Sequence, residues 1–225
     1  ITVRLVIQAG GGPCPAGPAA TPEITAGAFV NAASFVSSAL PNGAIARGSI
    51  FSMFGRNLGP TQLVVATSFP LSTTLGCVSL RVSLGATQVE AIPLAAIAGQ
   101  INALMPSNAP LGDATIAVTW NGRTSATRTV KIVGANFGFF TANQNGQGPA
   151  IVQNFESQTS LPVNSPRRPM RRGQRGVAYG TGLGGLTTPD NQPAPGGEPR
   201  VNVDLFLGGK RAVVEYAGKW LKIWE

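Results

Sequence analysis

The chain contains the stretch Gly48-Ser-Ile-Phe-Ser-Met-Phe-Gly-Arg-Asn-Leu-Gly-Pro60 and, 125 residues later, a second copy that reads Gly173-Gln-Arg-Gly-Val-Ala-Tyr-Gly-Thr-Gly-Leu-Gly-Gly185. Each copy has the pattern of a β-strand that ends in an aromatic residue and is followed by a glycine-rich turn. A repeat at the spacing of a domain indicates an internal duplication, so the sequence predicts two related halves. The corresponding positions are Gly48 and Gly173, Phe54 and Tyr179, Gly55 and Gly180, Leu58 and Leu183, and Gly59 and Gly184.

The composition favours an all-β protein. The 225 residues include 29 Gly and 18 Pro, too many for a helical chain, and apolar residues make up 43%, too many for a disordered one. The first half contains about seven short alternating segments, as an immunoglobulin-like (Ig-like) sandwich does. We expect two tandem Ig-like β-sandwich domains at residues 28–134 and 135–225, preceded by an N-terminal strand and a Gly/Pro-rich linker within residues 1–27.

Alternating apolar residues and turn signals mark the strands within each domain. In the first domain we expect strands at residues 78–84, 89–94, 100–105, 114–120 and 124–133. In the second we expect them around residues 138–141, 150–155, 175–179, 201–207 and 212–216. Hairpin turns are predicted at Gly85-Ala86, at Asn121-Gly122 and at Gly208-Gly209.

Several short motifs carry a family resemblance. Besides the two copies above, they are Asn31-Ala-Ala-Ser-Phe, Leu75-Gly-Cys-Val-Ser-Leu, Gly99-Gln-Ile-Asn-Ala-Leu-Met-Pro106, Asn121-Gly-Arg-Thr-Ser125 and Gly208-Gly-Lys-Arg-Ala212. Over about residues 28 to 218 the chain resembles a large uncharacterised family of bacterial, acidobacterial-type secreted-protein C-terminal modules with two tandem Ig-like halves. The resemblance implies a secreted, extracellular or cell-surface protein without an established activity. Cys77 departs from the family, whose members usually carry a second Gly there.

The repeat also predicts that the second domain is incomplete. The first domain continues past its Gly99-Gln-Ile-Asn segment with two more strands, whereas the chain ends at Glu225 without an equivalent of either. A sandwich that lacks strands exposes an apolar groove and unpaired backbone groups. We therefore expect another strand to fill the groove.

Residues 1–8 have the pattern of such a donor strand, because Ile1, Val3, Leu5 and Ile7 lie on one face of it. Residues 9–22 contain eight Gly or Pro among fourteen and are interpreted as a linker. If the strand comes from the next subunit, the contact is head-to-tail and builds a homopolymer. In the alternative interpretation, residues 1–8 form an edge strand of their own subunit and the chain is a truncated fragment.

The expected function is that of a structural subunit of an extracellular filament or surface assembly that polymerises by donor-strand exchange. The alternative is a secreted adhesive module that binds a polysaccharide or a cell surface through its loops. Seventeen Lys plus Arg against nine Asp plus Glu give a net charge of +8, which fits an anionic partner such as nucleic acid, an anionic polysaccharide or a cell surface. In the alternative interpretation, the charge has no partner, because charged residues make up only 12% of the chain and a polar surface of low charge is common in secreted β proteins. No apolar run approaches the roughly 18 residues that span a bilayer.

We expect no enzyme and no catalytic, metal-binding or cofactor-binding residues. His, the commonest general base, is absent, and the nine carboxylates are scattered along the chain. Gly180-Thr-Gly-Leu-Gly-Gly185 has the glycine spacing of a dinucleotide-binding loop. Leu186-Thr-Thr-Pro follows it, however, and cannot begin a convincing helix, so we interpret the motif as a turn.

The two cysteines, Cys14 and Cys77, are expected to form a disulfide, since a secreted chain permits one. The bond can lie within one subunit or between subunits, and two buried free thiols are the remaining alternative. Electrophoresis with and without reductant would separate these cases.

Two further groups of residues are candidates for contacts. The arginine cluster suits carboxylates, phosphates or sulfates, but it lacks the aromatic residues of a single-strand nucleic-acid site, so no specific nucleic acid is expected. A solvated loop or a subunit contact is the alternative for this cluster, which comprises Arg167, Arg168, Arg171, Arg172 and Arg175. The chain's last apolar residues are expected at a subunit interface or, alternatively, in a closing core strand; they are Trp220, Leu221, Ile223 and Trp224.

Overall fold

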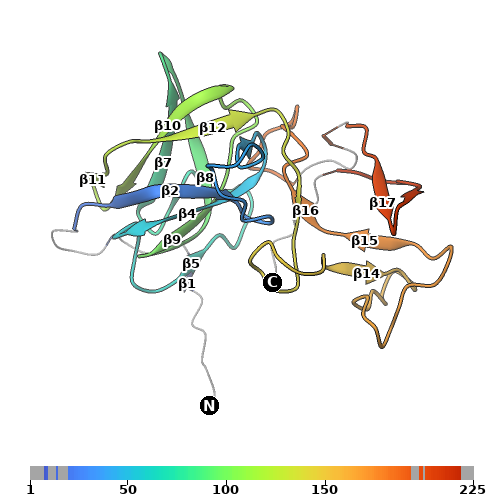
Figure 1. Ribbon diagram of the computed structural model, residues 1–225. Helices are drawn as coiled ribbons and strands as arrows, with labels where there is room; N and C mark the ends of the chain where they lie inside the picture. Colours follow the sequence, from blue (N-terminus) through green and yellow to red (C-terminus); the bar gives the residue numbers. More distant parts are fainter. Residues whose placement is uncertain (1–7, 10–13, 15–19, 194–197, 200, 219–225) are drawn as a thin grey trace.

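Figure 1 shows the computed structural model, which describes residues 8–9, 14, 20–193, 198–199 and 201–218. Every regular element in this part of the chain is a β-strand, so the expectation of an all-β protein is confirmed. The same residues contain no helix that could cross a membrane.

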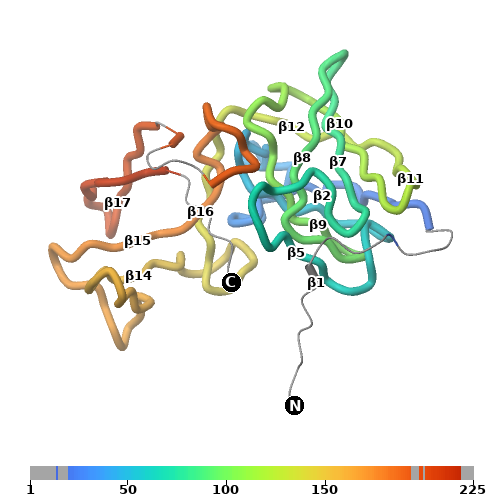
Figure 2. Tube along the Cα trace, turned by 180° about the vertical axis from the view of Figure 1, so that it is seen from behind, coloured from blue at the N-terminus to red at the C-terminus, as the bar shows by residue number. Residues whose placement is uncertain are grey.

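The first half, residues 20–134, forms one large sheet that curls into a shape close to a barrel (Figures 1 and 2). The two ends of this sheet approach each other, since the Nε of Arg128 donates a hydrogen bond to the carbonyl oxygen of Ile24 at 3.0 Å. The strand order is β2 (Glu23–Asn31), β4 (Ile50–Arg56), β9 (Gln100–Leu104), β8 (Thr87–Ile97), β7 (Val78–Leu84), β10 (Gly112–Trp120), β12 (Arg128–Val133) and β3 (Ile45–Ala46). Four short strands extend it: β1 (Gln8–Ala9), β5 (Val64–Val65), β6 (Thr74–Leu75) and β11 (Arg123–Thr124).

The strand β8 turns the sheet back on itself. Its residues 87–91 pair with β7 and its residues 92–97 pair with β9, with a register shift between Pro93 and Ala95. A bulge beside a proline bends a strand, because the ring removes one donor from the hydrogen-bond ladder. The bend closes the sheet over a core whose largest fully buried side chains include Phe51, Met53 and Leu80.

Most predicted strands of the first half are present, and β7 has the predicted bounds. The predicted hairpin turns are confirmed by the flanking pairs Leu84 with Thr87, Trp120 with Arg123, and Leu207 with Lys210. The first long strand, β2, begins at Glu23, before the expected domain start at residue 28.

Two predicted strands are wrong. The expected strand at residues 124–133 is divided into β11 and β12 by Ser125, whose buried hydroxyl accepts a hydrogen bond from the Val118 amide at 3.1 Å. The Ser125 amide donates to the Val118 carbonyl at 2.8 Å, as in a regular ladder, so the interruption lies at the Val118 amide, which bonds to the Ser125 side chain and not to a backbone carbonyl. The strand expected at residues 212–216 is replaced by β18 (Lys210–Ala212).

The second half, residues 135–218, lies beside the barrel and forms three separate two-stranded sheets (Figures 1 and 2). In these sheets β13 (Gly138–Phe139) pairs with β16 (Gly180–Thr181), β14 (Val152–Asn154) with β15 (Gly176–Ala178), and β17 (Leu205–Leu207) with β18.

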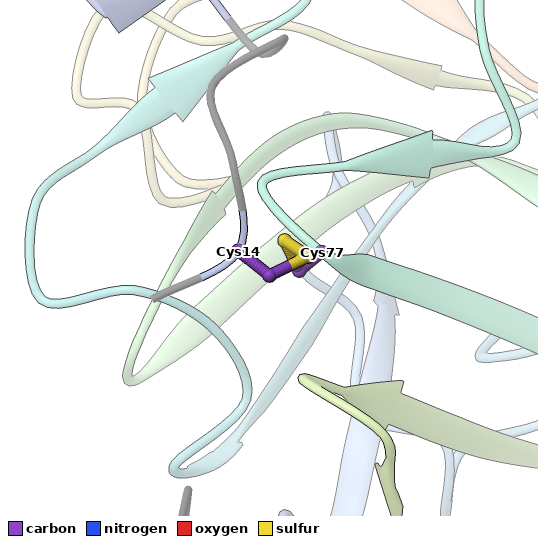
Figure 3. Close-up of a disulfide and its surroundings, with 2 residues drawn as sticks. All are labelled: Cys14 and Cys77. Carbon is purple, nitrogen blue, oxygen red and sulfur yellow. A yellow bond between two sulfur atoms is a disulfide. The ribbon is translucent and has the colours of Figure 1, made fainter. Parts of the chain in front are cut away.

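The N-terminal segment is attached to the barrel of its own chain. Gln8 and Ala9 pair in parallel with Val64 and Val65 of β5. Cys14 and Cys77 form a disulfide with a Cα–Cα distance of 5.6 Å (Figure 3). The bond therefore lies within one chain, which decides between the alternatives that the sequence left open.

Cys77 occupies an unfavourable backbone conformation. It lies with Gly76 in the two-residue turn between β6 and β7, where Leu75 pairs with Val78. The φ angles of Gly76 and Cys77 are 55° and 65°, so both are left-handed, as a type I′ turn requires. A left-handed backbone conformation costs about 1 kcal/mol or more at residues other than Gly, Asn or Asp, so glycine would fit position 77 with less strain than cysteine.

We predict that replacing Cys14 by Ser lowers the free energy of unfolding by about 4 kcal/mol, because the disulfide closes a long loop. Replacing Cys77 by Gly in that variant should restore about 1 kcal/mol, since glycine accepts the left-handed angle. Denaturant unfolding measures both steps. The matched control is Cys14→Ser with Cys77→Ala, which keeps a Cβ; equal stability of the Gly and Ala variants would contradict the strain at residue 77.

Candidate interaction surface

Two strand pairs of the second half repeat strand pairs of the first. The hairpin β17–β18 repeats β7–β8, because Val201-Asn-Val-Asp-Leu-Phe-Leu-Gly208 has the pattern of Val78-Ser-Leu-Arg-Val-Ser-Leu-Gly85. The pair β14–β15 is antiparallel like β2–β4, and β15 lies in the second copy of the repeated stretch as β4 lies in the first. Counterparts can therefore be assigned residue by residue.

The two related hairpins differ in burial. Three residues of β7 are fully buried, whereas their three counterparts are exposed or half-buried; the pairs are Val78 and Val201, Leu80 and Val203, and Val82 and Leu205. Five of the nine exposed large apolar side chains of the described chain also belong to this region. We call these five the apolar hairpin surface: Val201, Phe206, Leu207, Val213 and Tyr216.

Neighbouring strands explain this difference in burial. In the first half, β4 lies between β2 and β9, and β7 lies between β8 and β10. Within the described residues of the second half, β15 has β14 as its one strand neighbour and β17 has β18. Each of these strands thus has an edge that no described strand covers, and a two-stranded hairpin is only marginally stable by itself.

In the second half, an ion pair joins the counterparts of two residues that β9 separates in the first half. Leu104 of β9 lies between Ile50 of β4 and Ile92 of β8. The counterparts of Ile50 and Ile92 are Arg175 and Glu215, whose Nε and Oε2 atoms are 3.0 Å apart. Both side chains are exposed, and such a pair contributes at most about 1 kcal/mol to stability.

The second half is held against the barrel by a buried asparagine at the end of β2. The Nδ2 of Asn31 donates to the carbonyl oxygens of Asn136 and Thr181 at 3.1 and 3.2 Å. Its Oδ1 accepts from the amides of Ala33 and Ser34 at 2.9 and 3.2 Å. Asn31 therefore joins the barrel to β16 and to the segment just before β13. It also closes the turn that follows β2.

The asparagine is also repeated. Asn154 ends β14 as Asn31 ends β2, and it is likewise buried. Its Nδ2 donates to the Arg168 carbonyl oxygen at 2.8 Å, while its Oδ1 has no hydrogen-bond partner among the described residues. Neither asparagine was assigned this role from the sequence, although Asn-Ala-Ala-Ser at a strand end is typical of an asparagine-closed turn.

Further polar contacts fix the second half to the barrel. The carboxylate of Asp190 accepts hydrogen bonds from the amide and the hydroxyl of Ser107 at 2.7 and 2.6 Å. The Ser107 hydroxyl oxygen also accepts from the Leu186 amide at 2.7 Å. Asp190 was one of the carboxylates for which the sequence indicated no role, because Ser107 lies 83 positions away along the chain.

Tyr179, the counterpart of Phe54, forms a side-chain hydrogen bond to another residue of the second half. Its hydroxyl donates to the Oε1 of Gln153 at 2.7 Å. Burial raises the pKa of the Tyr179 hydroxyl above its ordinary value, because the charged form is poorly solvated. The residue is thus a neutral donor at physiological pH.

The structure places the predicted site residues in three groups. The disulfide of Cys14 and Cys77 is present, and the motif at residues 180–185 consists of β16 followed by irregular backbone, with no helix after it in the described chain. The five arginines of the cluster lie exposed between β14 and β15. The donor-strand residues Ile1, Val3, Leu5 and Ile7 and the interface residues Trp220, Leu221, Ile223 and Trp224 lie outside the described residues.

We predict that Thr181→Val destabilises the protein by about 1 to 3 kcal/mol, the cost of a buried donor that loses its acceptor. The amide of Ile50 donates to the Thr181 hydroxyl oxygen at 2.8 Å, across the contact between the halves. Thr181→Ser, which keeps the oxygen and loses one buried methyl group, is the control and should cost no more than about 0.8 kcal/mol. Denaturant unfolding and hydrogen exchange at Ile50 test this, and equal effects of Val and Ser would refute the role of the hydroxyl.

Comparisons with known proteins are limited to distant structures. No model of a protein family matches the chain, and no curated protein matches it. A structural genomics protein of unknown function from Bacteroides thetaiotaomicron VPI-5482 aligns with 78% of the chain at 12% identity and a TM-score of 0.35. An auxiliary nutrient binding protein from Bacteroides ovatus ATCC 8483 aligns with 75% at 13% identity and a TM-score of 0.27. The chain spans 43% and 38% of the lengths of these two proteins.

Proposed function

We propose that this protein is a structural subunit of an extracellular filament or surface assembly, in which each copy's second half is completed by a β-strand from the next copy. The observation that carries the proposal is the contrast between β7, whose Val78, Leu80 and Val82 are fully buried, and its counterpart, whose apolar residues are not. The same pattern of apolar residues is thus buried in the first half and at least partly exposed in the second.

The acceptor site has two components. The apolar hairpin surface offers side chains whose burial is favourable by about 25 cal/mol per Å² of apolar area. The edge of β17 that no described strand covers offers backbone donors and acceptors that an added strand can pair with. In the barrel, β10 covers the equivalent edge of β7, so a donor in the equivalent place would run along β17.

The donor in this proposal is the segment of residues 1–7, since Gln8 pairs with Val64 of its own chain. Its face of Ile1, Val3, Leu5 and Ile7 matches the alternating pattern of a buried strand. The β1–β5 pairing and the disulfide fix the following residues to the donor's own barrel. Seven residues beyond that anchor span at most about 24 Å, enough for a short strand that reaches a neighbouring copy.

The geometry of such a contact determines the assembly. The donor segment is attached to the first half, whereas the acceptor site is in the second half, so the two contacting surfaces differ. A contact between unlike surfaces is head-to-tail and extends into a filament when its rotation does not close a ring. In the proposed assembly, the interface also includes Trp220, Leu221, Ile223 and Trp224, because Trp220 ends the counterpart of the β8 segment that borders β9 and the other three follow it.

Two further parts of the proposal concern fold class and location. The repeated strand pairs β2–β4 with β14–β15, and β7–β8 with β17–β18, support two tandem Ig-like halves and the resemblance to the bacterial secreted-protein family. The disulfide supports an extracytoplasmic location, because thiols are kept reduced in the cytosol.

The proposal predicts opposite outcomes for two adjacent substitutions in the full chain. Leu5→Asp places a charge on the face that the acceptor buries, so polymers seen by electron microscopy and light scattering should be lost. Val6→Asp adds the same charge to the opposite face and should leave the polymers intact. Polymers that persist with Leu5→Asp, or that require Val6 equally, would refute donor-strand exchange, and a parent chain that stays monomeric would favour the adhesive module instead.

A further inference from the structure

The loop between β14 and β15, residues 155–175, has an unusual charge distribution. No Asp or Glu occurs from Ser157 to Pro189, whereas five arginines lie between residues 167 and 175. Two of the five are neutralised by carboxylates outside this stretch: Arg168 pairs with Glu156 at 3.1 Å and Arg175 with Glu215 at 3.0 Å. The remaining arginines are exposed and make no ion pair in the described chain: Arg167, Arg171 and Arg172.

The part of the loop that carries these arginines is held by two tight turns. In the first, the Arg168 amide donates to the Ser165 carbonyl oxygen at 2.9 Å, with Pro166 and Arg167 in the middle of the turn. In the second, the Gln174 amide donates to the Arg171 carbonyl oxygen at 3.0 Å, with Arg172 and Gly173 in the middle. The three arginines without an ion pair therefore lie in turns whose backbone is fixed by hydrogen bonds.

Side chains tie both turns to the strand β14 and its continuation. Asn154 donates to the Arg168 carbonyl oxygen at 2.8 Å, and Gln174 donates through Nε2 to the Phe155 carbonyl oxygen at 3.3 Å. The Gln174 Oε1 accepts from the Arg171 amide at 2.9 Å, and Asn164 Oδ1 accepts from the Met170 amide at 2.9 Å. A backbone fixed in this way loses little further entropy when a ligand binds.

We propose that Arg167, Arg171 and Arg172 form a binding site for an anionic polysaccharide, whose repeated carboxylate or sulfate groups pair with guanidinium groups. Guanidinium forks match planar and tetrahedral oxyanions with two hydrogen bonds each. Residues 156–178 contain no Phe, Tyr or Trp, whereas a single-stranded nucleic acid needs aromatic side chains for base stacking. This site is independent of the proposed strand exchange, since it uses neither the donor segment nor the apolar hairpin surface.

The test measures binding of the full chain to dextran sulfate and to polygalacturonate, with neutral dextran, single-stranded oligo(dT) and vesicles of anionic lipid as comparisons. The triple variant Arg167→Ser, Arg171→Ser, Arg172→Ser should weaken binding to the polysaccharides at least tenfold, and the parent's binding should fall steeply with salt. The control Arg56→Ser, Arg123→Ser, Lys131→Ser removes three exposed charges of the first half and should change affinity less than twofold.

Three results would overturn the proposal. Equal losses in the two triple variants would show that net charge alone drives binding. No binding of the parent to either polysaccharide at low salt would remove the ligand class. Tighter binding to oligo(dT) or to the vesicles than to the polysaccharides, lost in the same variant, would assign the arginines to nucleic acid or lipid headgroups instead.

Discussion

The structure depends on a close backbone contact between the two copies of the repeated stretch. Gly48 begins the first copy with a φ of 64°, and a Cβ on it would overlap the carbonyl oxygen of Gly184 in the second copy. The Ile50 amide donates to the Thr181 hydroxyl oxygen two residues further along. The duplicated motif thus provides the joint between the halves, because only glycine-rich backbones approach so closely.

The two halves show how far neighbours determine burial. The pattern of β7 and that of its counterpart at residues 201–207 are alike, yet one is a seven-residue strand and the other contains a three-residue strand. The difference lies in the adjacent strands, since β10 covers the edge of β7 and no described strand covers that of β17. Apolar alternation specifies a strand's faces, whereas a second sheet neighbour supplies the ladder that extends it.

The attachments of the second half are polar, unlike the core of the barrel. Asn31 and Asp190 each form a hydrogen bond between a side chain and the backbone of the other half, and such bonds are directional. Hydrogen bonds of this kind contribute modestly to stability when made, but leaving one partner buried and unsatisfied is costly, so they fix one arrangement of the halves. The β17 edge and the apolar hairpin surface lie in this second half, and their position relative to the donor's anchor on β5 follows from these bonds.

The sequence by itself determined the features that depend on near neighbours: the all-β class, the bounds of β7, and the hairpin turns at Gly85, Asn121 and Gly208. Alternation and glycine act within a few residues, so they can be read locally. Only the tertiary structure decided the break at Ser125, the roles of Asn31 and Asp190, and the unequal burial of the related hairpins. Each of these depends on groups brought together by the fold, such as Thr181 and Ile50, which lie 131 positions apart and whose contact leaves no local pattern in either segment.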